Sequence, residues 1–391
     1  MYPSMMASTP SAKPRRILAK AMSDRLGHDG PDDCVTSIRC NGREFHVEMS
    51  PFYICNSPAI ESRYRKFIAA VRDECEFDTD EDEHPEDVID AFHVWLINAF
   101  EPVFLQVAPD IPPSFDPAKI ATGEARPLLS EYFFPEEYRC RLEVENDKPF
   151  PIFMRDEESR WVPPLNDIEP ELAQQLGQYV KFFRPLEIEV SFEKPDSALS
   201  ETPTRVLVEL DDSGHKTLCF LKTFTPGDYL RLERELDAHL RILKSSLTHN
   251  DIRIARLRGV VAVEENSQIL GLLLTHIDRR RENDGLLFED HLLHTPIPLR
   301  QRWARQIQET VAQIHSAGLV WGDAKAENVM IDKNNDAWLI DFGGGYTEGW
   351  VDEDKAGTLE GDLQGVAKIV EHLSNEDYEP YPDSDDWEED V

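Results

Sequence analysis

Alternating hydrophobic and polar positions mark the first ordered part of the chain. The alternation around Asn41-Gly42, a pair that favours the positive φ angles of a type I′ turn, predicts a β-hairpin over residues 35–49. Apolar residues at helical spacing lie on both sides of an acidic loop at 73–87, and Pro102 should bend or end the second helix. With further extended segments and a third helix, residues 31–184 are predicted to form an α+β accessory domain, in which we find no catalytic constellation.

The pattern changes near residue 185, where short alternating strands replace the helices. Three strands, a helix and a second hairpin are predicted, in this order: 186–190, 205–210, 217–224, 227–243, and the pair 254–263 with 268–277. Strands in sequence followed by mainly helical segments are typical of an α+β fold.

A polar loop carries the residues with the clearest chemistry. It follows a long amphipathic helix that begins at Pro298 and ends at Gly318. A carboxylate, a lysine and an amide lie in it with the spacing D-x-K-x-x-N, formed by Asp323, Lys325 and Asn328. Phosphoryl transfer needs these residue types, because it depends on a carboxylate at the attacking hydroxyl and on ligands for a metal at the phosphates.

A second carboxylate loop, D-F-G beginning at Asp341, follows after a strand-turn-strand segment. The two loops together resemble the catalytic and metal-binding loops of eukaryotic protein kinases. The resemblance implies that Asp323 is the catalytic base and Lys325 a contact to the transferring phosphate. It also implies that Asn328 and Asp341 are ligands of Mg²⁺. A polar hairpin that caps a helix is the simpler alternative for the same residues.

Residues that precede the two loops extend the resemblance to the part of a kinase that binds the nucleotide. Lys222 is placed like the kinase lysine that holds the α- and β-phosphates, although a lysine at a strand edge can also simply extend its amine to solvent. Glu233 and Glu235 compete as its partner. In kinases the residue four positions after that glutamate packs under the D-F-G phenylalanine. Glu235 puts His239 there and Glu233 would put Asp237 there, and because a buried carboxylate is costly, we choose Glu235.

These matches imply a bilobal protein-kinase-like fold of the α+β class over residues 185–373, similar to the protein-kinase-like proteins of filamentous fungi. The hinge between its lobes would present Thr275 and Ile277 to the adenine of ATP. A basic tail at 1–30 and an acidic tail at 374–391 are expected to be disordered.

Several departures from the kinase pattern change what the resemblance implies. Trp321-Gly322 stands where most kinases have His-Arg, so no arginine is available there to bind a phosphorylated activation loop. The loop 193–204 contains no glycine, whereas kinases cover the phosphates with a glycine-rich loop. Between Asp341 and Asp362 there is no A-P-E, and the last helices of a full large lobe do not follow Leu373. Asp362 is expected to brace the catalytic loop from the next helix.

Composition limits the kinds of partner and the cellular compartment that fit the chain. Forty-one basic against 76 acidic residues give a net charge of -35, which disfavours nucleic acid or an anionic membrane as a partner. An ATP pocket in such a chain must supply its own positive field. The 6 cysteines form no C-x-x-C pair, as expected of reduced thiols in an intracellular, cytoplasmic protein. No apolar run approaches the length of a membrane helix. The basic N-terminus fits a mitochondrial transit peptide or, more simply, a disordered tail.

Three functions are compatible with these features. The favoured one is an ATP- and Mg²⁺-dependent protein kinase of the serine/threonine type, acting on an unidentified protein or small-molecule hydroxyl. The alternatives are a pseudokinase that binds partners without turnover and a small-molecule phosphotransferase. Both are favoured by the missing glycine-rich loop and docking segment. The enzyme hypothesis is favoured by retention of the following set: Lys222, Glu235, Asp323, Asn328 and Asp341.

Overall fold

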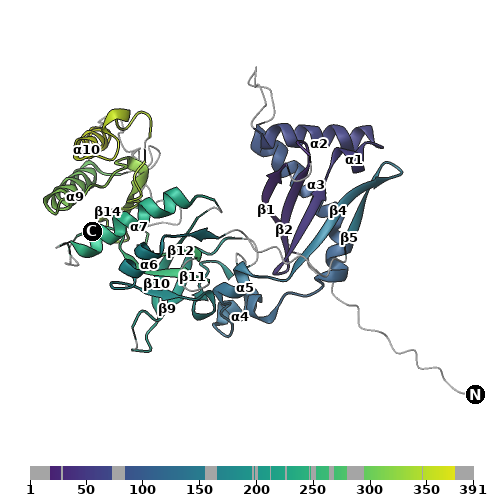
Figure 1. Cartoon of the computed structure of the whole chain (residues 1–391), viewed down its shortest axis with the longest axis horizontal. Coiled ribbons are helices and arrows are strands. Elements are labelled where there is room, and N and C mark those ends of the chain that lie inside the picture. Colours follow the sequence, from purple (N-terminus) through teal and green to yellow (C-terminus); the bar gives the residue numbers. More distant parts are fainter. Residues whose placement is uncertain are drawn as a thin grey trace, which may run out of the picture. The chain divides into compact units, whose positions relative to one another are not determined.

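The structure of the protein is a computed structural model (Figure 1). It describes residues 18–27, 30–72, 84–154, 165–195, 198, 201–211, 213–224, 227–245, 247, 252–263, 268–279, 295–345 and 347–374. The chain divides into two compact units: unit 1 consists of Met1–Val162 and Glu189–Pro203, and unit 2 of Pro163–Ile188 and Thr204–Val391. Both combine helices and sheets, so the fold is α+β, as predicted. Residues 1–17, 73–83 and 375–391, which hold most of the predicted tails and acidic loop, lie outside the described residues.

The sheet of unit 1 has the strand order β1-β2-β3-β4-β5. Its pairs are antiparallel except β3 with β4, which is parallel. Asn41 and Gly42 have φ angles of 48° and 77°, which is the type I′ turn expected from the sequence. The strands are β1 (Ala19–Leu26), β2 (Cys34–Cys40), β3 (Arg43–Met49), β4 (Glu137–Glu145) and β5 (Lys148–Met154). β1 occupies residues that we expected in the disordered basic tail.

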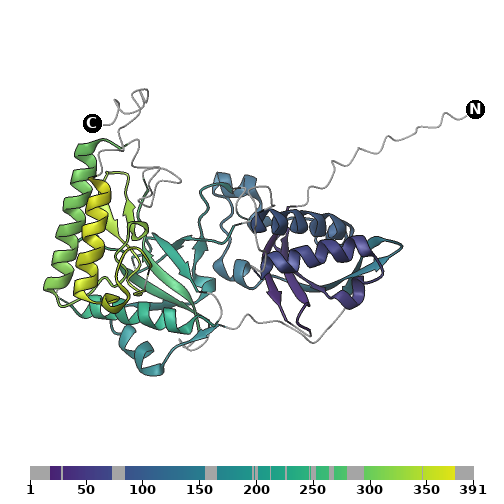
Figure 2. The same cartoon turned by 90° about the horizontal axis from the view of Figure 1, so that it is seen from above.

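Helices α1 (Pro51–Ile54), α2 (Pro58–Val71) and α3 (Pro85–Val107) pack with this sheet around one hydrophobic core (Figure 2). The rings of Phe67 and Phe92 stack between α2 and α3, with centroids 4.1 Å apart. Smaller elements complete the unit: η1 (Pro113–Phe115), α4 (Pro117–Thr122), α5 (Leu129–Phe133) and the short strand β8 (Glu189–Val190).

Helix α3 differs from two expectations. It continues through Pro102 to Val107, because burial of Phe100 and Phe104 offsets the hydrogen bond that the proline cannot make. Among the described residues it is also the one helix long and apolar enough to cross a membrane, although the sequence was expected to contain none. A core helix of a folded domain has the same composition, and Phe92, Leu96, Phe100 and Phe104 of α3 are buried in the core of unit 1.

The sheet of unit 2 runs in the order β7-β11-β12-β10-β9, and β6 pairs with β12. Neighbouring strands are antiparallel except β7 with β11. The strands are β6 (Asn166–Asp167), β7 (Lys181–Phe183), β9 (Arg205–Val208), β10 (Thr217–Thr223), β11 (Leu257–Ala262) and β12 (Gln268–Thr275). The predicted strand at 186–190 is wrong in its first half. The backbone amide of Arg184 donates to the side chain of Glu187 and closes a 3-10 turn, η2 (Pro185–Glu187).

Two hydrophobic clusters organise unit 2. One joins the sheet to α6 (Pro170–Leu176) and α7 (Tyr229–Lys244). The other joins α9 (Ile297–Ser316), α10 (Leu359–Leu373) and the hairpin of β13 (Val329–Ile331) and β14 (Ala337–Leu339), with α9 and α10 side by side (Figure 2). Short 3-10 turns, η4 (Ala326–Asn328) and η5 (Glu353–Lys355), flank the hairpin and α10. Helix α6 ends at Leu176, and Tyr179 and Val180 lie beyond it.

Candidate functional site

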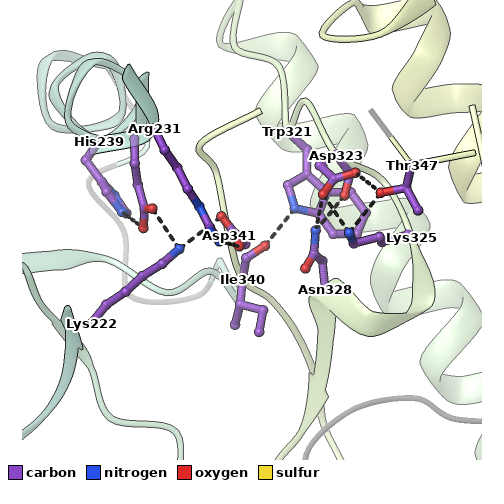
Figure 3. A network of polar contacts seen from close by, with 11 residues as sticks. Lys222, Arg231, His239, Trp321, Asp323, Lys325, Asn328, Ile340, Asp341 and Thr347 are labelled. Carbon is purple, nitrogen blue, oxygen red and sulfur yellow. Dashed lines mark hydrogen bonds and ion pairs between the residues drawn. The ribbon is translucent and has the colours of Figure 1, made fainter. Parts of the chain in front are cut away.

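A buried ion-pair cluster joins three segments of unit 2 (Figure 3). Lys222 extends from β10, and its Nζ lies 2.7 Å from Oε2 of Glu235 on α7. The same Nζ donates to Oδ1 of Asp341, 3.1 Å away on the loop after β14. The side chain of Glu235 is 0% exposed and that of Lys222 17%. Charges this enclosed are tolerated only when they are paired, so Lys222 holds two carboxylates from distant segments at one point.

The partner of Lys222 is Glu235 and not Glu233, in agreement with the choice made from the sequence. His239, one turn further along α7, is 2% exposed, and its Nε2 lies 3.8 Å from Oε1 of Glu235. Its ring centroid is 6.2 Å from that of Phe342. Asp237, the residue that the alternative pairing would have buried there, is exposed to solvent.

Asp341 has an unusual backbone and a perturbed carboxyl. Its φ angle is +57°, a left-handed conformation that is uncommon for a residue other than glycine and that occurs often at functional sites. Burial acts to raise the pKa of this carboxyl. The charges of Lys222 and Arg231, with hydrogen bonds from Lys222 and the backbone of Gly343, outweigh burial and lower the pKa of Asp341 below its ordinary value. The carboxylate is therefore held in its charged form, as a metal ligand must be.

The polar loop forms a second cluster around Asp323. The amide nitrogen of Asn328 donates to the backbone oxygen of Asp323 at 2.9 Å and to its Oδ2 at 3.0 Å. Nζ of Lys325 lies 3.0 Å from the same Oδ2. Thr347 closes the cluster, because its hydroxyl accepts from Lys325 at 2.9 Å and donates to Oδ1 of Asp323 at 3.2 Å. Asp323 is thus oriented by three side chains.

Asp362 on α10 holds the backbone of this loop in place. Its carboxylate accepts from the amides of Trp321 and Gly322 at 2.7 and 2.8 Å, as the sequence led us to expect. Nε2 of His315 lies 2.8 Å from the same carboxylate. The fully buried indole of Trp321 donates to the backbone oxygen of Ile340 at 2.9 Å, which ties the first loop to the residue before Asp341.

Close packing explains two glycines at the site. Gly322 has a φ of +95°, and a Cβ there would lie 3.1 Å from Cα of Gly344, so the arginine usual in kinases does not fit this backbone. Gly365 lets α10 approach the loop, since a Cβ at this position would lie 2.2 Å from the backbone oxygen of Ala324.

The oxygen atoms available at the site suit Mg²⁺. Because the amide nitrogen of Asn328 donates to Asp323, the amide oxygen remains as its ligand atom, and Asp341 supplies a carboxylate. Magnesium is usually bound by one or two such groups together with water and substrate phosphates. Within the described ranges no group of three or more His, Cys, Asp or Glu is placed to hold a metal by itself. The two oxygen donors fit a magnesium ion that takes its remaining ligands from water or a bound substrate.

The residues predicted to contact adenine are Thr275 and Ile277. The hydroxyl of Thr275 interacts with the backbone of Arg256, accepting from its nitrogen at 3.3 Å. Ile277, which has an apolar side chain, is 7% exposed. Their contact with adenine stays a prediction.

Two members of the clusters, Arg231 and Thr347, were not predicted from the sequence. Arg231 lies one helical turn before Glu235, a spacing that places both on one face of α7 and could have pointed to it. Its Nη2 is 3.6 Å from Oδ2 of Asp341. Thr347 donates a hydrogen bond to Asp323 although the two lie 24 positions apart, and no periodic signal in the sequence marks that approach.

Comparison with known proteins gives a partial similarity. No protein-family model matches the chain. A segment is 36% identical over 96 residues to serine/threonine-protein kinase PKH3 of Eremothecium gossypii. The similarity covers 22% of this chain and 13% of that kinase. Because the chain spans so little of this relative, the similarity indicates a kinase-like relationship only weakly.

Proposed function

We propose that unit 2 is an ATP- and Mg²⁺-dependent phosphotransferase of the serine/threonine protein-kinase type. In this proposal the sheet with α7 is the small lobe of a bilobal kinase-like fold. Helices α9 and α10 with the β13–β14 hairpin form the large lobe. The partial similarity to a serine/threonine kinase supports the same class.

The observation that carries the proposal is the position of Lys222 between Glu235 and Asp341. The three residues come from a strand, a helix and a loop. An enclosed charged cluster contributes little to stability, so a functional role accounts for its presence. A lysine fixed by a buried glutamate is suited to hold nucleotide phosphates beside a metal-binding carboxylate.

Each residue has a role in the proposed reaction. Lys222 would bind the phosphates of ATP, and Asn328 and Asp341 would hold magnesium, which neutralises phosphate charge when bound. Asp323 would accept the proton of the acceptor hydroxyl as the new O–P bond forms and the bond between the γ-phosphorus and ADP breaks. Lys325 and Thr347 would keep the Asp323 carboxylate oriented.

A pseudokinase is the second candidate, and one contact favours it. Both carboxylate oxygens of Asp341 already face cations, Lys222 at 3.1 Å and Arg231 at 3.6 Å. A protein that binds partners without turnover can satisfy its charges in this internal way. The loop 193–204 also favours a pseudokinase, because it has none of the glycines with which kinases cover the phosphates.

One paired experiment tests the proposal on the full chain. ATP binding is measured by calorimetry with and without magnesium, and γ-labelled ATP is used to follow hydrolysis and autophosphorylation. We expect magnesium-dependent binding and transfer of label. Binding without transfer would establish the pseudokinase, and absence of both would overturn the proposed function.

A further inference from the structure

Arg231 is the most accessible charged group of the cluster around Lys222. Its side chain is 57% exposed, against 27% for Asp341 and 17% for Lys222. It extends from α7 to Oδ2 of Asp341, whereas Lys222 lies at Oδ1 of the same carboxylate (Figure 3). At 3.6 Å the contact of Arg231 is an ion pair without a hydrogen bond. The guanidinium is therefore open to solvent and only weakly held by its partner.

The four charges of this cluster cancel. Lys222 and Arg231 are its cations, and Glu235 and Asp341 are its carboxylates. In a chain whose net charge is -35, such a balanced cluster leaves little positive field for the phosphates of a nucleotide. When Asp341 holds magnesium, Arg231 loses its partner, and its charge becomes available beside the metal.

Other groups that could bind the phosphates are absent from the sequence or already engaged. The loop 193–204 has no glycine with which to cover them. Lys325 donates to Thr347 at 2.9 Å and pairs with Asp323. Among the lysines and arginines that the structure describes in the two clusters, only Arg231 donates no hydrogen bond. Its N–H donors form a planar fork that can bind two phosphate oxygens at once.

We propose that Arg231 binds the phosphates of the nucleotide and so performs the function that the glycine-rich loop has in kinases. The guanidinium rests at Asp341 in the free protein and pairs with phosphate oxygens once magnesium occupies that carboxylate. Arg231 thereby selects for nucleotides that carry a phosphate chain. This role rests on the proposed nucleotide site.

Binding is tested by calorimetry on the full chain with ATP, ADP and adenosine at saturating magnesium. Arg231→Gln should weaken the binding of ATP and ADP by about tenfold and leave adenosine unchanged, because adenosine has no phosphate. Arg231→Lys keeps the charge but loses the fork of donors, so its loss should be intermediate. The control Arg241→Gln makes the same charge change on α7, at a residue that pairs with Asp237, and should have no effect.

The same titrations without magnesium test whether Arg231 changes partner. Arg231 then stays paired with Asp341, so Arg231→Gln should weaken ATP binding by only about twofold or less. An equal loss for adenosine, an equal loss with and without magnesium, or parental affinity of Arg231→Gln for ATP overturns the role of Arg231 and leaves the nucleotide site standing. A parent protein that binds neither ATP nor ADP overturns the proposed function and this role together.

Discussion

The two units use buried polar side chains in different ways. In unit 1, Asn41 donates from its amide to the backbone oxygen of Ala108 at 2.8 Å. Arg39 donates to the backbone oxygen of Tyr132 at 2.7 Å. The first contact ties the end of β2 to the C-cap of α3 and the second ties β2 to α5, and each satisfies a backbone carbonyl, so their role is structural.

In unit 2 the charged side chains around Lys222 converge on one another. Glu235 and Lys222 pair with each other and Lys222 also meets Asp341, although the side chain of Glu235 is 0% exposed. Such clusters cost free energy that a purely structural core avoids. The contrast predicts that substitutions of the buried polar residues in unit 1 lower stability and spare activity. Asp323→Asn and Asp341→Asn in unit 2 should instead lower activity and change stability little.

The largest effect is expected for Asp323→Asn. If Asp323 accepts the proton of the acceptor, its loss should cut phosphoryl transfer by about 10²–10⁴-fold and leave nucleotide affinity unchanged. Lys222→Met is the matched variant, because loss of a phosphate contact should weaken binding as well as turnover. Labelled-ATP transfer and calorimetry on both variants separate the two roles. A parental transfer rate in Asp323→Asn would show that this residue is not a base.

The next effect concerns Asp341→Asn. Removing the charged ligand should weaken magnesium-dependent nucleotide binding by at least about tenfold, judged by the usual cost of disturbing a metal site. The melting temperature should change little, because Lys222 keeps its ion pair with Glu235. Calorimetry with and without magnesium measures the first quantity. A variant with the same magnesium dependence as the parent would remove Asp341 from the metal site.

Substitution of a buried polar residue in unit 1 should lower stability and leave nucleotide binding unchanged. Asn41→Ala removes the hydrogen bond to Ala108 and leaves a buried carbonyl unsatisfied, at a cost of about 1–3 kcal/mol in the free energy of unfolding. Asn41→Gly loses the same hydrogen bond, but glycine adopts the positive φ angle easily. The difference between the two variants therefore measures the strain in the turn. Denaturant unfolding measures both variants. A loss of nucleotide affinity at unchanged stability would contradict the contrast between the units.

The sequence predicted the long-range cluster better than some simple strands. Glu235 was preferred because, in the packing that the kinase resemblance implies, the alternative would have buried the carboxylate of Asp237 at a high cost in free energy. Strand β1 was missed because its register shifts between Ala21 and Ser23, which breaks the alternation that marks a strand. Strands as short as β6 and β7 have too few residues to show any period.

The pH dependence of stability offers a smaller test. The folded-state pKa of Asp341 is lowered, so its contribution to stability is present above the unfolded pKa of about 4 and is lost as pH falls through the folded value. The parent should exceed Asp341→Asn in stability by about 1 kcal/mol or less near neutral pH, and the gap should narrow in acid. Denaturant unfolding at several pH values measures this gap. A gap that widens in acid would contradict the lowered pKa.

The smallest expected effect decides what Arg231 does at Asp341. Its side chain is 57% exposed and lies 3.6 Å from Oδ2, so solvent and salt screen the pair. A metal that binds this oxygen must displace Arg231, the more exposed of the two cations on Asp341. Arg231→Gln should therefore lower the magnesium concentration needed for nucleotide binding, by up to about fivefold.

Arg241→Gln is the control for that last measurement, since it makes the same charge change on α7, where Arg241 pairs with Asp237 and is 72% exposed. The difference between the two variants should shrink at high salt, because only a local ion pair is involved. If Arg231→Gln instead raises the magnesium requirement, Arg231 positions Asp341 for the metal and does not compete with it. In that case the contact between Arg231 and Asp341 would no longer favour a pseudokinase.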